Sequence, residues 1–222
     1  MELYHGLDVL QIIANRQPQL SQNVRDIIDQ FLTSPGTLET DAFQMSFSGN
    51  PDDLGQWRGY AANGMGCSVV TDALAIKNIA DVAGWVIYDP VDQEAFATAV
   101  LSRLSGVTDL LQIAQAVAAA ASYMKHEGFS SEQEFRLLIF PDLAEVKFRE
   151  STDRLVPSVE ILDRGRVLPI DRVIIGPGWQ LSGLPPKEVA MHHVPQAIQR
   201  LLSANGLVNT NIESSQIPYD PR

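Results

Sequence analysis

One segment of the chain alternates apolar and polar side chains with a period of two. It is Ser-Ser-Glu-Gln-Glu-Phe-Arg-Leu-Leu-Ile-Phe, residues 130–140, and this period predicts a half-buried β-strand. Successive side chains of a strand point to opposite faces, so we expect Glu132, Glu134 and Arg136 to share one face. Two carboxylates and a guanidinium held together suit a site that stabilises positive charge or binds a hydroxyl group. A solvated ladder of surface charges is the alternative interpretation.

Apolar residues at helical spacing predict several helices. They recur every three to four positions over residues 6–33 and 187–205, and residues 91–126 contain two helices that separate near Gly106. The second of these, about residues 109–125, includes four consecutive alanines whose small side chains allow close packing. We therefore expect it to be the central buried helix. Gly206 is expected to end the last helix as a C-cap.

Short apolar or alternating runs predict the other strands, and Asp52 is the expected N-cap of a short helix between the first two. The segment 145–149 is a candidate partner of the charged strand. This pattern predicts one α+β domain, residues 1–222, with a mixed, mainly antiparallel sheet and packed helices. The other predicted strands are residues 43–48, 67–71, 85–88, 145–149, 168–176 and 208–213.

The composition supports a globular protein and excludes some partners. Of 222 residues, 45% are hydrophobic and 19% charged, which is enough apolar material for a core. The formal net charge of −11, with no dense Lys/Arg run, argues against a general nucleic-acid binder or a binder of anionic membranes. The chain shows neither an apolar run of about 18 residues nor a signal peptide, so we expect a cytoplasmic location.

Cysteine and histidine give little support to a metal or redox site. Cys67 is the single cysteine, which excludes an intrachain disulfide, and its place in a predicted strand favours a buried structural thiol. The four histidines lack the spacing of common metal motifs, so no metal is expected. The pair His192-His193 falls in a predicted helix and is expected to be a surface feature.

Two further polar elements accompany the charged strand, which has Lys125 just upstream. Ser46 and Ser48 share one face of a predicted strand, and Gln56-Trp57-Arg58-Gly59-Tyr60 lies in a predicted short helix. Each has a structural alternative, because Ser-Phe-Ser is a common strand sequence and aromatic residues three apart on a helix often serve packing. The glycines at 64 and 66 do not complete a phosphate-binding loop.

The order of these motifs resembles the bacterial family known as domain of unknown function 2971, over nearly the whole chain. The residues that carry the resemblance are Phe43-x-Met45-Ser46-Phe47-Ser48, Asp53-x-x-Gln56-Trp57-x-x-Tyr60-x-x-x-Gly64-x-Gly66, Lys125 to Arg136 with Phe129, Ile174-Ile175-Gly176-Pro177 and Ser215-x-Ile217-Pro218-Tyr219-x-x-Arg222.

Family members usually begin with a His-Tyr-Thr strand, followed by a turn that leads into Glu-x-x-x-Gly. Residues 1–7 resemble the tail of that turn, so this alignment predicts that the chain lacks the usual first strand and its histidine. A second alignment takes Leu3-Tyr4-His5-Gly6 as the histidine motif itself. We favour the first, because the distance from Gly6 to Ser46 suits it.

The family's motif order is similar to that of ADP-ribosyltransferases, and this resemblance implies a site for NAD. By it, Glu134 is the catalytic carboxylate that stabilises an oxocarbenium-like centre, and Glu132 orients or deprotonates the acceptor. Ser46 and Ser48 would support the NAD pocket, and Arg136 or Lys125 would pair with the diphosphate. The resemblance also places Gln56, Trp57 and Tyr60 at the nucleotide.

The leading hypothesis is therefore a bacterial enzyme that cleaves NAD and transfers ADP-ribose to an acceptor or to water. A role in toxin–antitoxin or phage-defence systems is the natural setting. The competing hypothesis is a non-catalytic binding or assembly module, whose incomplete sheet would leave an edge for pairing with a second copy in a homodimer. A metal-dependent hydrolase that uses Glu132, Glu134 and a histidine ranks last.

Overall fold

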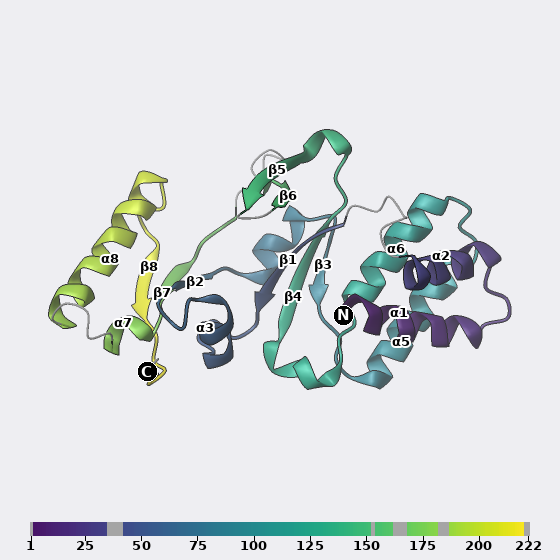
Figure 1. Cartoon of the computed structure of the whole chain (residues 1–222), viewed down its shortest axis with the longest axis horizontal. Helices are drawn as coiled ribbons and strands as arrows, with labels where there is room; N and C mark the ends of the chain where they lie inside the picture. The colour runs from purple at the N-terminus through teal and green to yellow at the C-terminus, as the bar shows by residue number, and fades with distance from the viewer. Residues whose placement is uncertain (1, 35–41, 152–153, 162–167, 182–186, 220–222) are drawn as a thin grey trace. The chain divides into compact units, whose positions relative to one another are not determined.

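The computed structural model describes residues 2–34, 42–151, 154–161, 168–181 and 187–219 (Figure 1). The chain divides into two compact units, one made of Met1–Phe47 and Lys77–Arg166, the other of Ser48–Ile76 and Val167–Arg222. Each unit contains helices and its own sheet, and each is described by itself. The α+β class is confirmed, since the described strands form small, mostly antiparallel sheets and one mixed sheet.

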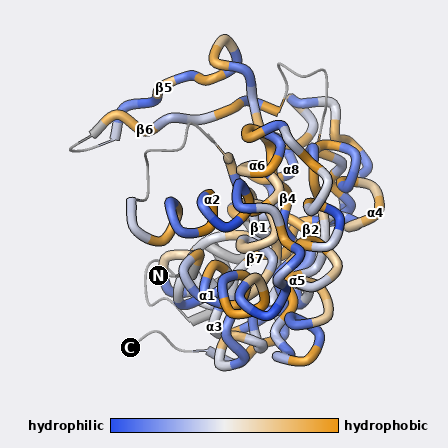
Figure 2. Tube along the Cα trace, turned by 90° about the vertical axis from the view of Figure 1, so that its right-hand side faces the viewer, coloured by the Kyte–Doolittle hydropathy of each residue, from blue (hydrophilic) through white to orange (hydrophobic). Residues whose placement is uncertain are grey.

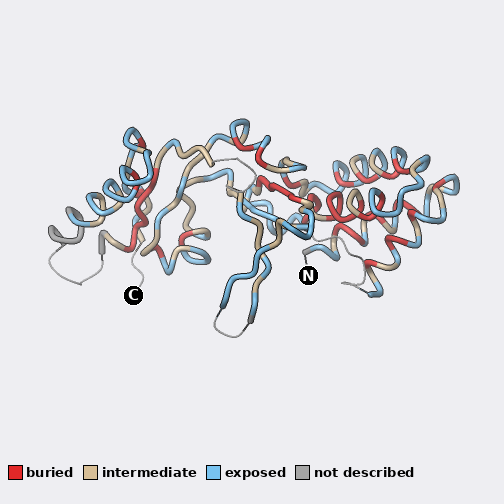
Figure 3. The backbone as a smooth tube through the Cα atoms, turned by 90° about the horizontal axis from the view of Figure 1, so that it is seen from above, coloured by how far each residue is buried: buried red, intermediate tan, exposed pale blue. Residues whose placement is uncertain are grey.

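A helical bundle forms the main core of the first unit. Its helix α6 contacts the other three helices, and Ala118, Ala120 and Ala121 are buried in it, which confirms the predicted central helix. Asp109 caps α6 by accepting from the N–H groups of Leu111 and Gln112. Buried residues line the facing sides of all four helices (Figure 3). The bundle consists of α1 (Glu2–Asn15), α2 (Gln22–Thr33), α5 (Pro90–Leu104) and α6 (Leu110–Ser122).

The sheet of the first unit has the order β1-β4-β3, with β1 Phe43–Ser48, β3 Val82–Trp85 and β4 Glu134–Ile139. Strands β3 and β4 are antiparallel, and Gly84 lies opposite Arg136. The prediction of a half-buried strand is wrong for β4, because every residue after Glu134 is buried. A central strand is covered on both faces, whereas the alternation pattern assumes that one face is exposed to solvent. The predicted strand 85–88 lies earlier in the chain, at Val82–Trp85.

A two-stranded arm follows β4. It consists of β5 (Val146–Ser151) and β6 (Arg154–Val159), paired antiparallel with each other, after the short helix η3 (Leu143–Glu145). The predicted pairing of 145–149 with the charged strand is therefore wrong. Hydrophilic and hydrophobic residues are interspersed along the arm (Figure 2), and β5 is exposed after its first residue (Figure 3). Phe148 and Leu155 are 67% and 66% exposed.

The second unit holds a mixed sheet of order β2-β7-β8, with β2 Cys67–Val70, β7 Arg172–Ile175 and β8 Asn211–Ser214. Strands β2 and β7 are antiparallel, and β7 and β8 are parallel. Cys67 is exposed, so the prediction of a buried thiol is wrong: Cys67 begins a strand at the outer side of the sheet. The helices of this unit are α3 (Leu54–Tyr60), α4 (Ala73–Ile76), α7 (Gly178–Leu181) and α8 (Lys187–Ala204).

Two predicted helix boundaries have different outcomes. Gly206 follows α8 with a φ of 78°, and the N–H of Leu207 donates to the carbonyl of Leu202 at 2.9 Å, which confirms the glycine C-cap. The N-cap of α3 is Asp53, whose carboxylate accepts from the N–H of Gln56, so the expected cap at Asp52 is wrong. His193 is exposed on α8 as predicted.

Candidate functional site

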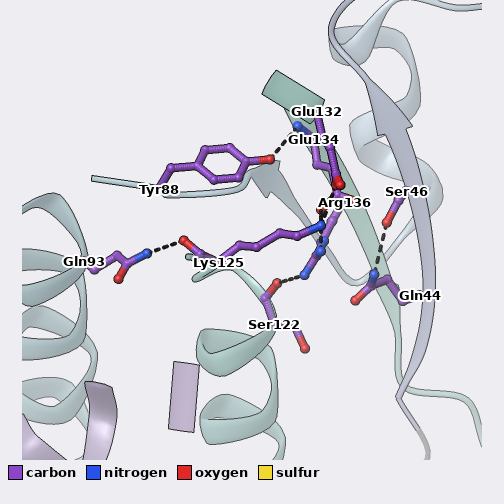
Figure 4. Close-up of polar contacts among 9 residues, drawn as sticks. All are labelled: Gln44, Ser46, Tyr88, Gln93, Ser122, Lys125, Glu132, Glu134 and Arg136. Carbon is purple, nitrogen blue, oxygen red and sulfur yellow. Dashed lines mark hydrogen bonds and ion pairs between the residues drawn. The ribbon is translucent and has the colours of Figure 1, made fainter. Parts of the chain in front are cut away.

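Four charged side chains from three consecutive segments meet at the start of β4 (Figure 4). Lys125 follows α6, Glu132 ends the 3₁₀ helix η2 (Glu127–Glu132), and Glu134 and Arg136 lie on β4. Gln133 turns the chain from η2 into β4 with a φ of 45°. Glu132 therefore does not lie on the strand, and the prediction that it shares a strand face with Glu134 and Arg136 is wrong. The left-handed turn nevertheless brings its carboxylate into the same cluster.

Lys125 lies between the two carboxylates. Its Nζ is 2.5 Å from Oε2 of Glu132 and 3.5 Å from Oε2 of Glu134. A guanidinium nitrogen of Arg136 also donates to Oε2 of Glu134. The side chains of Lys125 and Arg136 are each 3% exposed, against 14% for Glu134 and 26% for Glu132. The cluster thus has two buried cations and two carboxylates nearer the solvent, so the interpretation as a solvated surface ladder is wrong.

Arg136 is fixed by the backbone around it. Its Nη1 donates to the carbonyl of Ser122 at the end of α6, and the carbonyl of Arg136 accepts from the hydroxyl of Tyr123 at 2.9 Å. Burial raises the pKa of Tyr123 to about 12, although the charge of Arg136 acts against it. Tyr123 is therefore a protonated donor throughout the physiological range. These two bonds hold the guanidinium and the backbone of Arg136 in place beside Glu134.

Two aromatic side chains border the cluster. The backbone N–H of Glu134 donates to the hydroxyl of Tyr88 at 3.0 Å. Burial raises the pKa of Tyr88, and the nearby carboxylate charges add to this rise, while the hydrogen bond from the N–H of Glu134 and the charge of Lys125 oppose it. Nζ of Lys125 lies 4.7 Å from the centre of the Phe129 ring, a cation–π contact. Phe129 is 44% exposed, so its ring is accessible next to the charges.

Gln93, a buried residue of α5, holds the backbone of Lys125. Its Nε2 donates to the carbonyls of Ile87 and Lys125 at 2.7 and 2.8 Å, and its side chain is almost fully enclosed, at 2% exposure. Because the amide nitrogen makes both of these bonds, its Oε1 must accept from Nε2 of His5, 3.0 Å away. His5 is therefore protonated on Nε2. A buried amide with all these bonds satisfied fixes the position of Lys125.

The structure places the two predicted serines near each other on β1, the strand beside β4. Ser46 accepts from the side-chain amide of Gln44 at 3.0 Å (Figure 4). Ser48, at the end of β1, accepts from the N–H of Asn50 at 3.2 Å. Ser46 is exposed and Ser48 is partly buried. Ser46 is thus accessible on the strand next to the charged cluster.

The other predicted binding residues lie on α3 in the second unit. Trp57 is 3% exposed, and its indole N–H donates to Oδ1 of Asp52 at 2.7 Å. Tyr60 is 82% exposed, and Gln56 donates its backbone N–H to Asp53 at 3.0 Å. A role for these residues at a nucleotide stays a prediction. The described contacts of Trp57 are those of a packing residue.

Asp52 joins this helix to the C-terminal segment of the same unit. Its carboxylate accepts from the hydroxyl of Ser215 at 2.6 Å and from the N–H of Gln216 at 2.8 Å, besides the indole of Trp57. Burial acts to raise the pKa of Asp52, but the three hydrogen bonds outweigh it and hold the pKa below the ordinary value of 3.8. Asp52 is therefore ionised at neutral pH and holds two distant segments together.

We expect Asp52→Ala to lower the free energy of unfolding by about 2 kcal/mol at pH 7, because the buried donors of Trp57 and Ser215 lose a charged acceptor. A carboxyl group whose pKa is lower in the folded state stabilises above its unfolded pKa, near 3.8, and this stabilisation is lost as pH falls through the folded value. The difference between variant and wild type should therefore shrink below about pH 4. Urea unfolding of the variant and of wild type at pH 7 and at pH 3 measures this difference.

Asp171→Asn is the matched control, since Asp171 is an exposed carboxylate of the same unit. It should leave the unfolding midpoint nearly unchanged at both pH values. A difference between Asp52→Ala and wild type that stays constant from pH 7 to pH 3 would show that the charge of Asp52 is not what stabilises this contact.

Sequence patterns did not identify three residues of the cluster's surroundings. Tyr88 follows a strand and precedes Asp89-Pro90, and nothing in its spacing indicates that its hydroxyl reaches β4. His5 and Gln93 lie 88 positions apart. Gln93 lies near the N-terminus of α5, between Asp92 and Glu94, and no pattern there indicates that its amide is buried.

Residues 56–137 match the model of the family described as "Protein of unknown function (DUF2971)". The matched range contains α3 from Gln56 onward and the whole Lys125–Arg136 cluster, so the predicted resemblance is confirmed for this stretch. The motifs before residue 56 and after residue 137 lie outside the match. No curated protein and no solved structure matches the chain significantly.

Metal-ligand groups and membrane-spanning helices are both absent from the described residues. These residues contain no group of three or more His, Cys, Asp or Glu side chains placed to hold a metal ion. Among the helices in the described ranges, none combines the length and the hydrophobicity that a membrane-spanning segment needs.

Proposed function

We propose that the cluster of Lys125, Glu132, Glu134 and Arg136 is the catalytic centre of an ADP-ribosyltransferase-like enzyme that acts on NAD. The observation that supports it is the asymmetric environment of Glu134. Its Oε2 is bound by both Lys125 and Arg136, whereas its Oε1 has no hydrogen-bond donor among the described residues. One oxygen is thus anchored, and the other is left for a ligand on a side chain that is 14% exposed.

An anchored carboxylate suits the breaking of the bond between nicotinamide and ribose. As this C–N bond breaks, its electron pair leaves with nicotinamide, and positive charge develops on the ribose carbon. Oε1 of Glu134 would stabilise that charge, and it needs no reorganisation because Oε2 is already held. The two buried cations lie against Glu134 and also supply positive potential for a diphosphate.

Glu132 is placed to serve the second half of the reaction. It is the most exposed member of the cluster, at 26%, and so the one best reached by an acceptor hydroxyl or by water. The acceptor oxygen bonds to the ribose carbon, and its proton passes to Glu132. If water is the acceptor, the products are nicotinamide and ADP-ribose. Ser46 on the neighbouring strand is available to hold a polar part of the nucleotide.

The test is to incubate the protein with NAD and to follow the release of nicotinamide by chromatography. Glu134→Gln should reduce the rate by about 10²–10³-fold, because the amide keeps the shape of the carboxylate but not its charge. Glu94→Gln is the control, since Glu94 is an exposed glutamate in a surface pair with Arg16. It should retain the wild-type rate.

Two results would contradict the proposal. One is the absence of both nicotinamide release and NAD binding by the wild-type protein in calorimetry. The other is a Glu134→Gln variant that releases nicotinamide as fast as wild type while Glu94→Gln is also unaffected, since the reaction would then belong to a different part of the protein.

A second candidate is a non-catalytic module that assembles with a second copy. Strand β1 has one neighbour among the described strands, and three successive residues of it, Gln44 to Ser46, are exposed. An open edge of this kind can pair with another chain. Light scattering of the 24.4 kDa chain decides between one copy and two. A monomer at all concentrations would exclude the homodimer.

A further inference from the structure

Tyr88 and Glu134 each have one hydrogen-bonding atom without a partner among the described residues. The oxygen of Tyr88 accepts the backbone N–H of Glu134 at 3.0 Å, so its O–H proton points to a different acceptor. Oε1 of Glu134 is the oxygen that neither Lys125 nor Arg136 binds. The cluster thus offers one free donor, the phenol, and one free acceptor, the carboxylate oxygen.

The two atoms are held in relation to each other by the backbone of a single residue. Tyr88 is bonded to the N–H of Glu134, and Oε1 ends the side chain of that same residue (Figure 4). The carboxylate is fixed by two cations, and Ile87, the residue before Tyr88, is held by hydrogen bonds to Tyr123 and Lys125 at 2.8 and 3.1 Å. Donor and acceptor are therefore preorganised.

The chemistry of this pair selects the ligand group. An anionic group at Oε1 would be repelled by the carboxylate, and a cation would leave the phenol unused. A single alcohol fills one of the two positions. Two neighbouring hydroxyl groups fill both, because one donates to the carboxylate while the other accepts from the phenol.

We infer that Tyr88 is a specificity-determining residue, which together with Oε1 of Glu134 binds the two adjacent hydroxyls of a ribose. This inference rests on the proposed function and names the part of NAD that the site recognises, the diol of the ribose that carries nicotinamide. Tyr88 also positions Glu134 through its backbone N–H. The experiment must therefore distinguish a direct contact of the Tyr88 hydroxyl with the ligand from its role in holding the backbone of Glu134.

Carba-NAD serves as the probe, because its cyclopentane ring keeps both hydroxyls and cannot be cleaved. Binding of carba-NAD and of its 2′-deoxy and 3′-deoxy forms is measured by calorimetry for wild type, Tyr88→Phe and the control Tyr4→Phe, which alters an exposed tyrosine of α1. Tyr88→Phe should weaken carba-NAD binding roughly tenfold. It should have no effect on one deoxy form, the one that lacks the hydroxyl facing the phenol.

The outcomes are distinguishable. Equal weakening of all three ligands by Tyr88→Phe would show that Tyr88 only supports Glu134 and would overturn the inference while the proposed function stands. Deoxy forms that bind wild type as tightly as carba-NAD would overturn it without any variant, even if Tyr88→Phe failed to fold. If wild type binds neither NAD nor carba-NAD, the proposed function and the diol site both fail.

Discussion

Replacing Gly6 with alanine should lower the free energy of unfolding by about 3 kcal/mol, the upper part of the range for overpacked cores. A Cβ atom on Gly6 would lie 2.1 Å from the carbonyl oxygen of Ala121 and 2.6 Å from its Cα. Both are backbone atoms of α6, so no side chain can rotate away. Helices α1 and α6 would have to separate, and the buried contacts between them would be lost. The better helix propensity of alanine, about 1 kcal/mol, opposes only part of this cost.

Gly59→Ala is the matched control, because Gly59 is also inside a helix and nothing lies within 4 Å of a Cβ there. It should be neutral or should stabilise by up to about 1 kcal/mol. Chemical unfolding followed by circular dichroism compares both variants with wild type. Equal stability of Gly6→Ala and wild type would show that α1 and α6 are not packed as closely as the structure has them.

The close approach at Gly6 also bears on the charged cluster. His5 precedes Gly6 on α1, and it reaches the amide of Gln93, which in turn binds the carbonyl of Lys125. A shift of α1 would move His5 away from the amide of Gln93, and Gln93 would then hold the carbonyl of Lys125 less firmly. Gly6→Ala should therefore disturb the position of Lys125 as well as global stability.

Periodicity identified the elements whose packing follows a local rule. The bundle helices were predictable because α2, for example, buries Val24, Ile27, Ile28 and Phe31 at helical spacing. Strand β1 has the predicted bounds, 43–48. The same rule failed for β4, where the polar positions hold buried charges paired with each other. Period-two alternation cannot distinguish a wet strand face from a face that carries satisfied ion pairs.

The candidate site was predictable in its charged members but not in its arrangement. The four predicted charged side chains do meet: Glu132, Glu134, Arg136 and Lys125. Glu132, however, lies on a 3₁₀ helix, and Gln133, in a left-handed conformation, turns the chain from that helix into β4. No local preference of Gln133 predicts that turn, because positive φ favours glycine or asparagine. Tyr88 and Gln93 depend on tertiary contacts between segments 32 to 46 positions apart, which a single sequence does not encode in any short pattern.

Replacing Arg136 with methionine should have the second large effect, a loss of about 3–5 kcal/mol in the free energy of unfolding. The side chain is 3% exposed and donates to Glu134 and to the carbonyl of Ser122. Its removal leaves Glu134 in a poorly hydrated place with Lys125 alone at 3.5 Å. A carboxylate that loses one of its two cations in a poorly hydrated place is destabilised by more than the ion pair contributes, so most of the loss comes from the charge left behind. Arg16→Met is the control: its pair with Glu94 is about 60% exposed on both sides and should cost at most about 1 kcal/mol.

The double variant Glu134→Gln/Arg136→Met tests that explanation. If the stranded charge causes the loss, neutralising Glu134 should restore part of the stability, and the cycle of the two single variants and the double variant should give a coupling of about 1–3 kcal/mol. Additive effects in the unfolding midpoints would mean instead that Arg136 stabilises the sheet through its bond to Ser122 and its packed aliphatic stem. The charged cluster would then be a consequence of the fold, and the anchored state of Glu134, on which the proposed chemistry depends, would need another source.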